Sequence, residues 1–232
     1  MLMSRKVMKT QSGITSILDP NHPKVIARYP STVATSTSWP DVGPNGYDFT
    51  VVSGTISPQA DGVIRNNAVV RNSHPFLDGL EDFEILLYGR WSGDAGGIMD
   101  YYYNANSETG VAGPFFFQTY SNAQKRFRMR KTPIGSVTKT MAPTPLIVGG
   151  VSFRRVGQVV TLDFGGYVTT YDDPSMLGVM PTNTGDWELF SIGGGGAPAG
   201  SAVQIADMVF LNEPATDEER AEWYNDWVAY AP

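Results

Sequence analysis

The sequence NEPATDEERAEWYNDWVAY, residues Asn212 to Tyr230, has the pattern of a capped helix near the end of the chain. Thr216 is a favoured N-cap residue, and Glu219, three positions later, completes a capping box. Pro214 precedes this cap, at a position where helix boundaries are common. The stretch therefore predicts a helix that starts beside Thr216.

The apolar residues of this helix form a stripe. They recur at positions i, i+1, i+4 and i+5, as Trp223, Tyr224, Trp227 and Val228. A stripe of this kind is poorly soluble when it faces water. We therefore expect the helix to lie against the rest of the protein.

The chain between residues 25 and 215 has the pattern of strands and turns. Short runs rich in β-branched and aromatic residues are separated by Gly, Pro, Asn and Asp, and a helical period is almost absent. In FEILLYGRW, alternation places Phe83, Ile85, Leu87 and Trp91 on one face and Glu84, Tyr88 and Arg90 on the other. We expect the first face to be core and the second to face solvent.

Turn residues and a late strand complete this pattern. Gly157 lies in a turn between two apolar runs, and Gly165-Gly166 suits the positive φ angles of a tight hairpin turn. In VQIADMVFL, alternation places Ala206, Met208 and Phe210 on one face. These features favour an all-β sandwich or barrel.

The run IADMVFLNEPATDEERAEWY resembles the end of concanavalin A-like jelly-roll domains of the laminin-G type. The matching positions are Ile205, Asp207, Met208, Phe210, Thr216, Glu219 and Tyr224. Other runs match the same family in the same order, including the Asp-x-Gly-Pro-Asn-Gly loop at residues 41–46 and FEILLYGRW. The resemblance implies an all-β, concanavalin A-like jelly-roll sandwich of two antiparallel sheets with a short C-terminal helix. Ala206 stands where the family has one of two paired aspartates, so the resemblance implies no metal site here.

Two regions are expected. Residues 1–20 are polar, rich in Met and basic, which predicts an N-terminal arm that orders against a partner. Residues 21–232 are expected to form one laminin-G-like jelly-roll domain, a usual size for a single all-β unit.

Composition excludes several classes of partner. The net charge of −6 argues against nucleic acid, because binding to phosphates needs a positive surface. No Cys is present, so disulfides and Cys-ligated zinc are excluded. The sequence shows neither a signal peptide nor an apolar run long enough to cross a membrane. We expect no membrane partner and synthesis in a host cytoplasm.

The search for catalytic and metal-binding motifs is negative. Glycosidases on this fold carry two carboxylates at alternate positions of one strand, because both must reach the same face. The nearest cluster, residues 81–84, lies at the start of a strand, where solvated charges are common. His22 and His74 each lie beside a proline and are far apart in the sequence. We therefore predict no enzyme activity, no cofactor and no metal.

Two groups of residues are candidate binding sites. Asp94, Asp100, Tyr101, Tyr103 and Asn104 combine acidic and amide groups with tyrosines, which suits a glycan, although the same runs also suit cross-strand packing. In KRFRMRK, a strand presents Arg126, Arg128 and Arg130 on one face. These guanidinium groups suit an anion or an acidic partner, although they also suit the solvent face of an amphipathic strand.

Two functions follow from these observations. The first is a non-enzymatic structural or assembly module on the virion surface of a bacteriophage, as a head-decoration or tail-associated protein. Its partners would be other virion proteins or copies of itself, bound through the N-terminal arm. The alternative is a carbohydrate-binding adhesion module whose partners are surface glycans.

Overall fold

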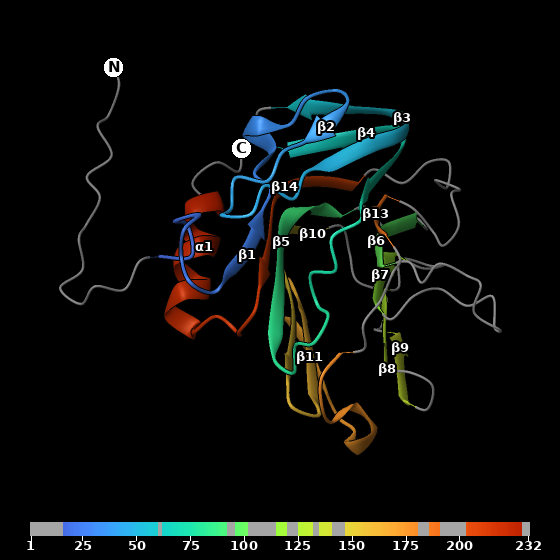
Figure 1. The fold of residues 1–232 in the computed structure, drawn as a ribbon, viewed down its shortest axis with the longest axis vertical. Helices are drawn as coiled ribbons and strands as arrows, with labels where there is room; N and C mark the ends of the chain where they lie inside the picture. The colour runs from blue at the N-terminus through green and yellow to red at the C-terminus, as the bar shows by residue number, and fades with distance from the viewer. Residues whose placement is uncertain are drawn as a thin grey trace.

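The computed structural model describes residues 16–59, 62–91, 96–101, 115–119, 125–131, 135–140, 147–180, 186–190 and 203–228. Within these ranges the chain forms antiparallel β-structure with one α-helix near the C-terminus (Figure 1). The prediction of an all-β sandwich with a short C-terminal helix is confirmed.

The strands fall into two groups. The first has the order β12-β11-β10-β5-β14, and β1 also pairs with β14. The second has the order β4-β13-β6-β7-β8-β9, with β3 paired to β4 and β2 to β3. The groups join where β14 pairs with β4.

The bounds are β1 (Val25–Arg28), β2 (Ser38–Trp39), β3 (Phe49–Gln59), β4 (Gly62–Asn72), β5 (Phe83–Trp91), β6 (Gly96–Tyr101), β7 (Phe115–Thr119), β8 (Lys125–Lys131), β9 (Gly135–Thr140), β10 (Ile147–Val156), β11 (Val159–Phe164), β12 (Tyr167–Asp172), β13 (Trp187–Leu189) and β14 (Val203–Leu211), with short 3-10 helices η1 (Ser31–Val33) and η3 (Pro174–Met176).

The main core lies between the two groups. It contains Phe83, Ile85 and Leu87, so the predicted core face of β5 is confirmed for these three residues. Phe76, between β4 and β5, stacks on Phe210 of β14 with ring centroids 4.3 Å apart. Burial of these large side chains from both groups is what holds the sandwich together.

A second, smaller core lies on the other face of the first group, beneath the helix; we call this face the helix-side face. Its buried residues are Ile17, Val25, Leu86, Tyr88, Ala206, Val209, Leu211, Ala215 and Trp223. The expectation that this face of β5 is in solvent is therefore wrong for Glu84 and Tyr88, which are buried, although Arg90 is exposed. The helix covers this part of the face and removes it from water.

A β-bulge in β14 changes which residues share a face. Because the register shifts between Ile205 and Asp207, Ala206 lies in the helix-side core while Met208 and Phe210 lie in the main core. The expected sharing of one face by these three residues is therefore wrong. A Cβ added to Gly89 of β5 would lie 2.1 Å from the carbonyl oxygen of Gln204, so only glycine allows this approach.

The helix α1 (Asp217–Val228) begins as the sequence predicts. The Thr216 Oγ accepts from the backbone N–H of Glu219 at 3.2 Å, and Glu219 accepts from the backbone N–H of Thr216 at 2.7 Å. The capping box is confirmed. The predicted apolar stripe is only partly confirmed, because Trp223 is 1% exposed whereas Tyr224 is 39% exposed. The side chain of Trp227 lies outside what the structure describes.

The glycine turns and the N-terminal arm are the remaining predicted features. Gly157 has φ +55°, and Gly165 and Gly166 have φ +58° and +89°, so both predicted hairpin turns are confirmed. Residues 1–15 of the predicted arm lie outside the described residues. Ile17 is buried in the helix-side core, so the chain is already packed against the domain at that point.

Candidate functional site

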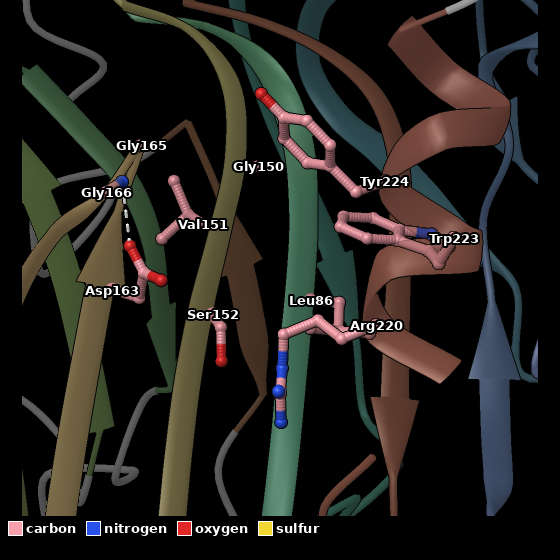
Figure 2. A pocket seen from close by; sticks show the side chains of 10 residues that line it. All are labelled: Leu86, Gly150, Val151, Ser152, Asp163, Gly165, Gly166, Arg220, Trp223 and Tyr224. Carbon is pink, nitrogen blue, oxygen red and sulfur yellow. Dashed lines mark hydrogen bonds between the residues drawn. The ribbon is translucent and has the colours of Figure 1, made fainter. Parts of the chain in front are cut away.

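An open pocket of about 340 Å³ lies on the helix-side face, between α1 and the β10–β11 hairpin. Ten residues line it: Leu86, Gly150, Val151, Ser152, Asp163, Gly165, Gly166, Arg220, Trp223 and Tyr224. Figure 2 shows Tyr224, Trp223 and Arg220 on the helix and Asp163 on the opposite side, across β10. Its volume is at the lower end of the range for small-molecule sites, roughly 300–1,000 Å³.

The floor of the pocket is set by strand register. Ser152 of β10 pairs with Leu86 of β5 on one side and with Asp163 of β11 on the other. Residues paired directly across a sheet share a face, so these three lie in a row beneath the pocket. The row continues to Val168 of β12, which is 61% exposed. The helix therefore covers only one end of the row, and the pocket begins where its cover ends.

Glycines lower the floor next to the helix. A Cβ added to Gly150 would lie 3.0 Å from Cδ2 of Tyr224 and 3.4 Å from Cζ3 of Trp223. The two aromatic rings therefore rest directly on the backbone of β10. Gly165 donates its backbone N–H to the carbonyl oxygen of Gly150 at 3.0 Å, which extends the β10–β11 pairing to the end of the hairpin.

The aromatic wall is rigid at its base and open at its edge. The rings of Trp223 and Tyr224 both meet Tyr88 of β5 edge-on, with centroids 6.3 Å and 5.8 Å away. Burial raises the pKa of Tyr88, and the neighbouring Tyr224 raises it further. Trp223 is held by a hydrogen bond from its Nε1 to Oδ2 of Asp207 at 3.0 Å. Tyr224 thus presents a partly exposed ring from a fixed position.

A buried carboxylate, Glu84 of β5, fixes the polar wall. Arg220 donates to it from Nε at 2.8 Å and from Nη2 at 3.1 Å. The Ser152 hydroxyl and the backbone N–H of Ala215 also donate to it. The hydrogen bond to Glu84 raises the pKa of Arg220 and outweighs the effect of burial. The sequence-based interpretation of Glu84 as a solvated charge is therefore wrong, since the side chain is fully buried.

Two more ion pairs hold the N-terminal part of the domain against this region. Arg28 of β1 bonds Asp207 of β14 at 3.0 Å, and Lys24 bonds Glu219 of α1 at 2.8 Å. Burial raises the pKa of Glu219, but the hydrogen bonds from Lys24 and from the backbone of Thr216 lower it by more. The helix is therefore fixed by charged contacts to Lys24, which precedes β1, and to Glu84 of β5, and by the Trp223 hydrogen bond to Asp207 of β14.

The pocket combines an aromatic ring, one carboxylate and hairpin backbone. Such a set suits a small ligand with one apolar face and several hydroxyl groups. No group of three or more His, Asp or Glu in the described ranges could hold a metal ion. Among the described residues no helix is long and apolar enough to cross a membrane.

The structure describes the backbone of two of the five candidate glycan residues predicted from sequence. Asp100 and Tyr101 are on β6, where they pair with Glu188 and Trp187 of β13, and their side chains lie outside what is described. Asp94, Tyr103 and Asn104 lie outside the described residues. This group stays a prediction, and β6 belongs to a different group of strands from those beneath the pocket.

The predicted arginine strip is on β8. Arg126, Arg128 and Arg130 occupy alternate positions there and pair with Thr140, Thr138 and Ser136 of β9. The backbone of a strand is confirmed at this place, while the binding role stays a prediction because these side chains are not described. The strip and the pocket are on different groups of strands.

Comparison with known proteins gives similarity in structure alone. No family model matches the sequence, and no curated protein matches it. The binding domain of botulinum neurotoxin DC in complex with rat synaptotagmin II superposes with TM-score 0.66 at 11% identity, over 88% of this chain and 52% of that one. A botulinum neurotoxin type C structure, described as showing that cell entry depends on two ganglioside molecules, gives TM-score 0.64 at 10% identity, over 88% and 51%. Trypanosoma rangeli sialidase in complex with sialic acid gives 0.59 at 12% identity, over 88% and 33%.

The chain shares the fold of these proteins. Their similarity confirms a lectin-like β-sandwich of the jelly-roll kind, and at these identities it shows nothing beyond the fold. The chain spans about half the length of the neurotoxin domains and a third of the sialidase. Their ligands and activities therefore belong to larger molecules, and any function must be argued from this chain's own residues.

Proposed function

We propose that this protein is a carbohydrate-binding adhesion module, and that the pocket between α1 and the β10–β11 hairpin receives a sugar. The observation that carries the proposal is the exposed ring of Tyr224 and the carboxylate of Asp163 on opposite sides of one open pocket. A sugar ring has an apolar C–H face, which packs on an aromatic ring, and hydroxyls at its edge, which need polar partners.

The aromatic contact is already positioned in the structure without a ligand. Tyr224 is held by Tyr88 and Gly150, and the helix that carries it is fixed through Glu84 and Asp207. A ring that is already immobile loses little conformational entropy when a ligand binds. The structural neighbours include a neurotoxin described with gangliosides and a sialidase described with sialic acid. These ligands support carbohydrate as the general class of ligand.

The residues of the pocket favour binding over hydrolysis. Glycoside hydrolysis commonly uses two carboxylates placed about 5–10 Å apart around the bond that breaks. Asp163 is the one carboxylate among the residues that line the pocket. Glu84 lies behind Ser152 and Arg220, fully buried and fully engaged in hydrogen bonds, so it cannot reach a ligand. We therefore propose a module without catalytic activity.

The aromatic contact gives the first test. Replacing Tyr224 with Ala should weaken sugar binding at least about tenfold, equivalent to about 1.4 kcal/mol, because the ligand loses the ring that covers its apolar face. The measurement is a glycan array followed by titration calorimetry on the strongest hit. Tyr167→Ala is the matched control, since Tyr167 is 50% exposed on β12 and lies outside the pocket.

The same titration separates the two candidate glycan sites. Loss of binding in Tyr101→Ala with no change in Tyr224→Ala would move the site to β6 and contradict the pocket. A blank array at high protein concentration would contradict glycan binding altogether.

The location on a bacteriophage virion surface, and assembly through the N-terminal arm, remain a second proposal based on the sequence. If it is right, the protein should be present in purified particles, and deletion of residues 1–15 should remove it from them while the domain stays folded. Incorporation of the truncated protein at the normal level would exclude the arm as the attachment.

A further inference from the structure

We infer that the pocket selects uncharged sugars over acidic ones, and that Asp163 is the residue that enforces this choice. The inference rests on the proposed function, because it names the class of sugar that the same site takes. It is based on the hydrogen-bond partners of the two charged residues that line the pocket, Arg220 and Asp163.

The positive charge in the pocket lining is already engaged. Arg220 donates from Nε and Nη2 to Glu84, again from Nη2 to the carbonyl oxygen of Ala215 at 2.8 Å, and from Nη1 to Asp217 at 2.8 Å. An Arg has five N–H donors, so four of the five are committed. Two carboxylates also surround this one guanidinium group. An acidic sugar would therefore find neither a free bidentate donor pair nor net positive charge at Arg220.

The negative charge in the lining is available. The Asp163 carboxylate accepts from the backbone N–H of Gly166 at 2.9 Å through Oδ1, and among the described residues this is the one hydrogen bond of that side chain. A carboxylate has about four acceptor sites on its two oxygens. Oδ2 of Asp163 can therefore accept from a sugar hydroxyl, in a hydrogen bond strengthened by its charge. The same oxygen would repel the carboxylate of an acidic sugar in the same place.

Other charges on this face do not reverse the balance. Arg154 lies two positions from Ser152 on β10 and pairs across the sheet with Glu84 of β5, outside the pocket lining. Arg220 pairs with the carboxylates of Glu84 and Asp217, and within the described residues no ion pair joins Asp163 to a cation. The local balance thus favours neutral ligands.

The test uses pairs of ligands that differ in one group. Methyl glycosides of glucose and galactose are titrated against those of glucuronic and galacturonic acid, in which a carboxylate replaces the primary alcohol. We expect wild-type protein to bind at least one neutral glycoside tenfold or more tightly than its acidic counterpart. In Asp163→Asn, which keeps the acceptor for Gly166, the ratio should fall to about threefold or less because the acidic ligand is no longer repelled.

Asp172→Asn is the matched control. Asp172 is exposed on β12 and also accepts one side-chain hydrogen bond, from Gln158, but it lies outside the pocket. Its variant should keep the wild-type ratio, and thermal unfolding checks that both variants are folded. Equal or tighter binding of the acidic glycoside by wild type, or an unchanged ratio in Asp163→Asn, would overturn the inference while leaving the proposed function intact. If none of the four glycosides binds, the inference fails, while the proposed function is decided separately by the glycan array.

Discussion

Replacing Trp223 with Ala should lower the free energy of unfolding by about 3–5 kcal/mol, the usual cost of deleting a buried aromatic side chain. Trp223 is 1% exposed and, among the described residues, is the side chain that the helix contributes to the helix-side core. The change also removes the Nε1 hydrogen bond to Asp207. Because α1 covers this part of the sheet, detachment of the helix would expose Leu86, Tyr88 and Val209 to water. Urea unfolding followed by circular dichroism measures the effect.

Two further variants separate packing from the hydrogen bond. Trp223→Phe keeps a six-membered aromatic ring in the core but loses the five-membered ring with its donor to Asp207, so it should cost about 1.5–3 kcal/mol, less than Trp223→Ala. Tyr224→Ala, one position along the helix and 39% exposed, should cost about 1 kcal/mol or less. If Trp223→Ala barely changed stability but abolished binding, the helix would be an interface and not part of the folded core.

Local signals in the sequence predicted the elements of the fold well. The Thr216 and Glu219 capping box located the start of the helix within one residue, and the glycine pair at Gly165 located a hairpin turn. These features depend on residues close together in the chain, so a single sequence contains them. Alternation likewise predicted Ile85 and Leu87 in the main core.

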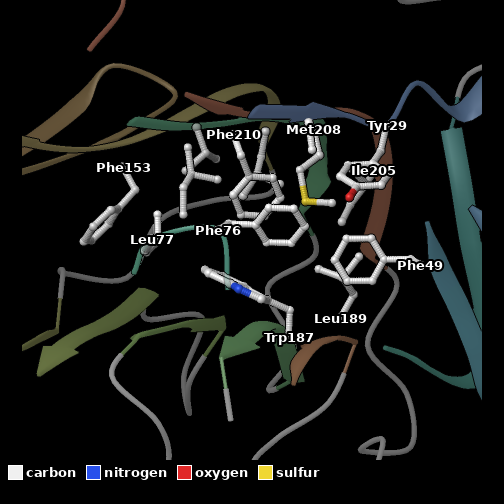
Figure 3. Packing of buried hydrophobic residues seen from close by; sticks show 14 of the residues in the cluster. Tyr29, Phe49, Phe76, Leu77, Phe153, Trp187, Leu189, Ile205, Met208 and Phe210 are labelled. Atoms are coloured by element: carbon white, nitrogen blue, oxygen red, sulfur yellow. The ribbon is translucent and has the colours of Figure 1, made fainter. Parts of the chain in front are cut away.

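Contacts between distant segments were not predictable in this way. Figure 3 shows Phe76 packed beside Phe210 and Trp187. The ring centroid of Trp187 is 5.7 Å from that of Phe76 and 5.1 Å from that of Phe210. Phe76 follows β4 in a segment without alternation, so no period marks it as core. The bulge beside Ala206 was equally unpredictable from the sequence. Gly89 lies opposite it, but a single glycine in a strand does not by itself identify a bulge.

The candidate site depends entirely on such long-range contacts. Tyr224, Gly150 and Asp163 belong to three different elements, and no sequence pattern indicates that they lie together. Sequence reasoning placed Tyr224 in an apolar stripe and favoured clusters of aromatic residues close together in the chain instead. The signal that was present is a helix with two adjacent aromatic residues, because neighbouring positions on a helix point about 100° apart, so one of the two lies at the edge of the buried face.

The buried ion pair between Glu84 and Arg220 gives the second large effect. Replacing Arg220 with Leu should lower the free energy of unfolding by about 3–5 kcal/mol, because it leaves a buried carboxylate without its partner. Glu84 is fully buried, whereas Arg220 is 20% exposed. The loss should therefore be larger for Arg220→Leu than for Glu84→Gln, in which Arg220 can still reach water and the amide oxygen still accepts from Ala215.

Combining the two changes tests the cause. In the double variant Glu84→Gln with Arg220→Leu, neither position carries a charge, and an acceptor for the backbone N–H of Ala215 is kept. If the uncompensated charge is the source of the loss, the double variant should be more stable than Arg220→Leu alone, and the two effects should not add. Strict additivity would mean that the pair contributes nothing through its charges and that Arg220 matters only for the packing of its stem. The wall of the pocket would then be set by Trp223 and Tyr224 alone, and sugar binding should survive in Arg220→Leu wherever the protein remains folded.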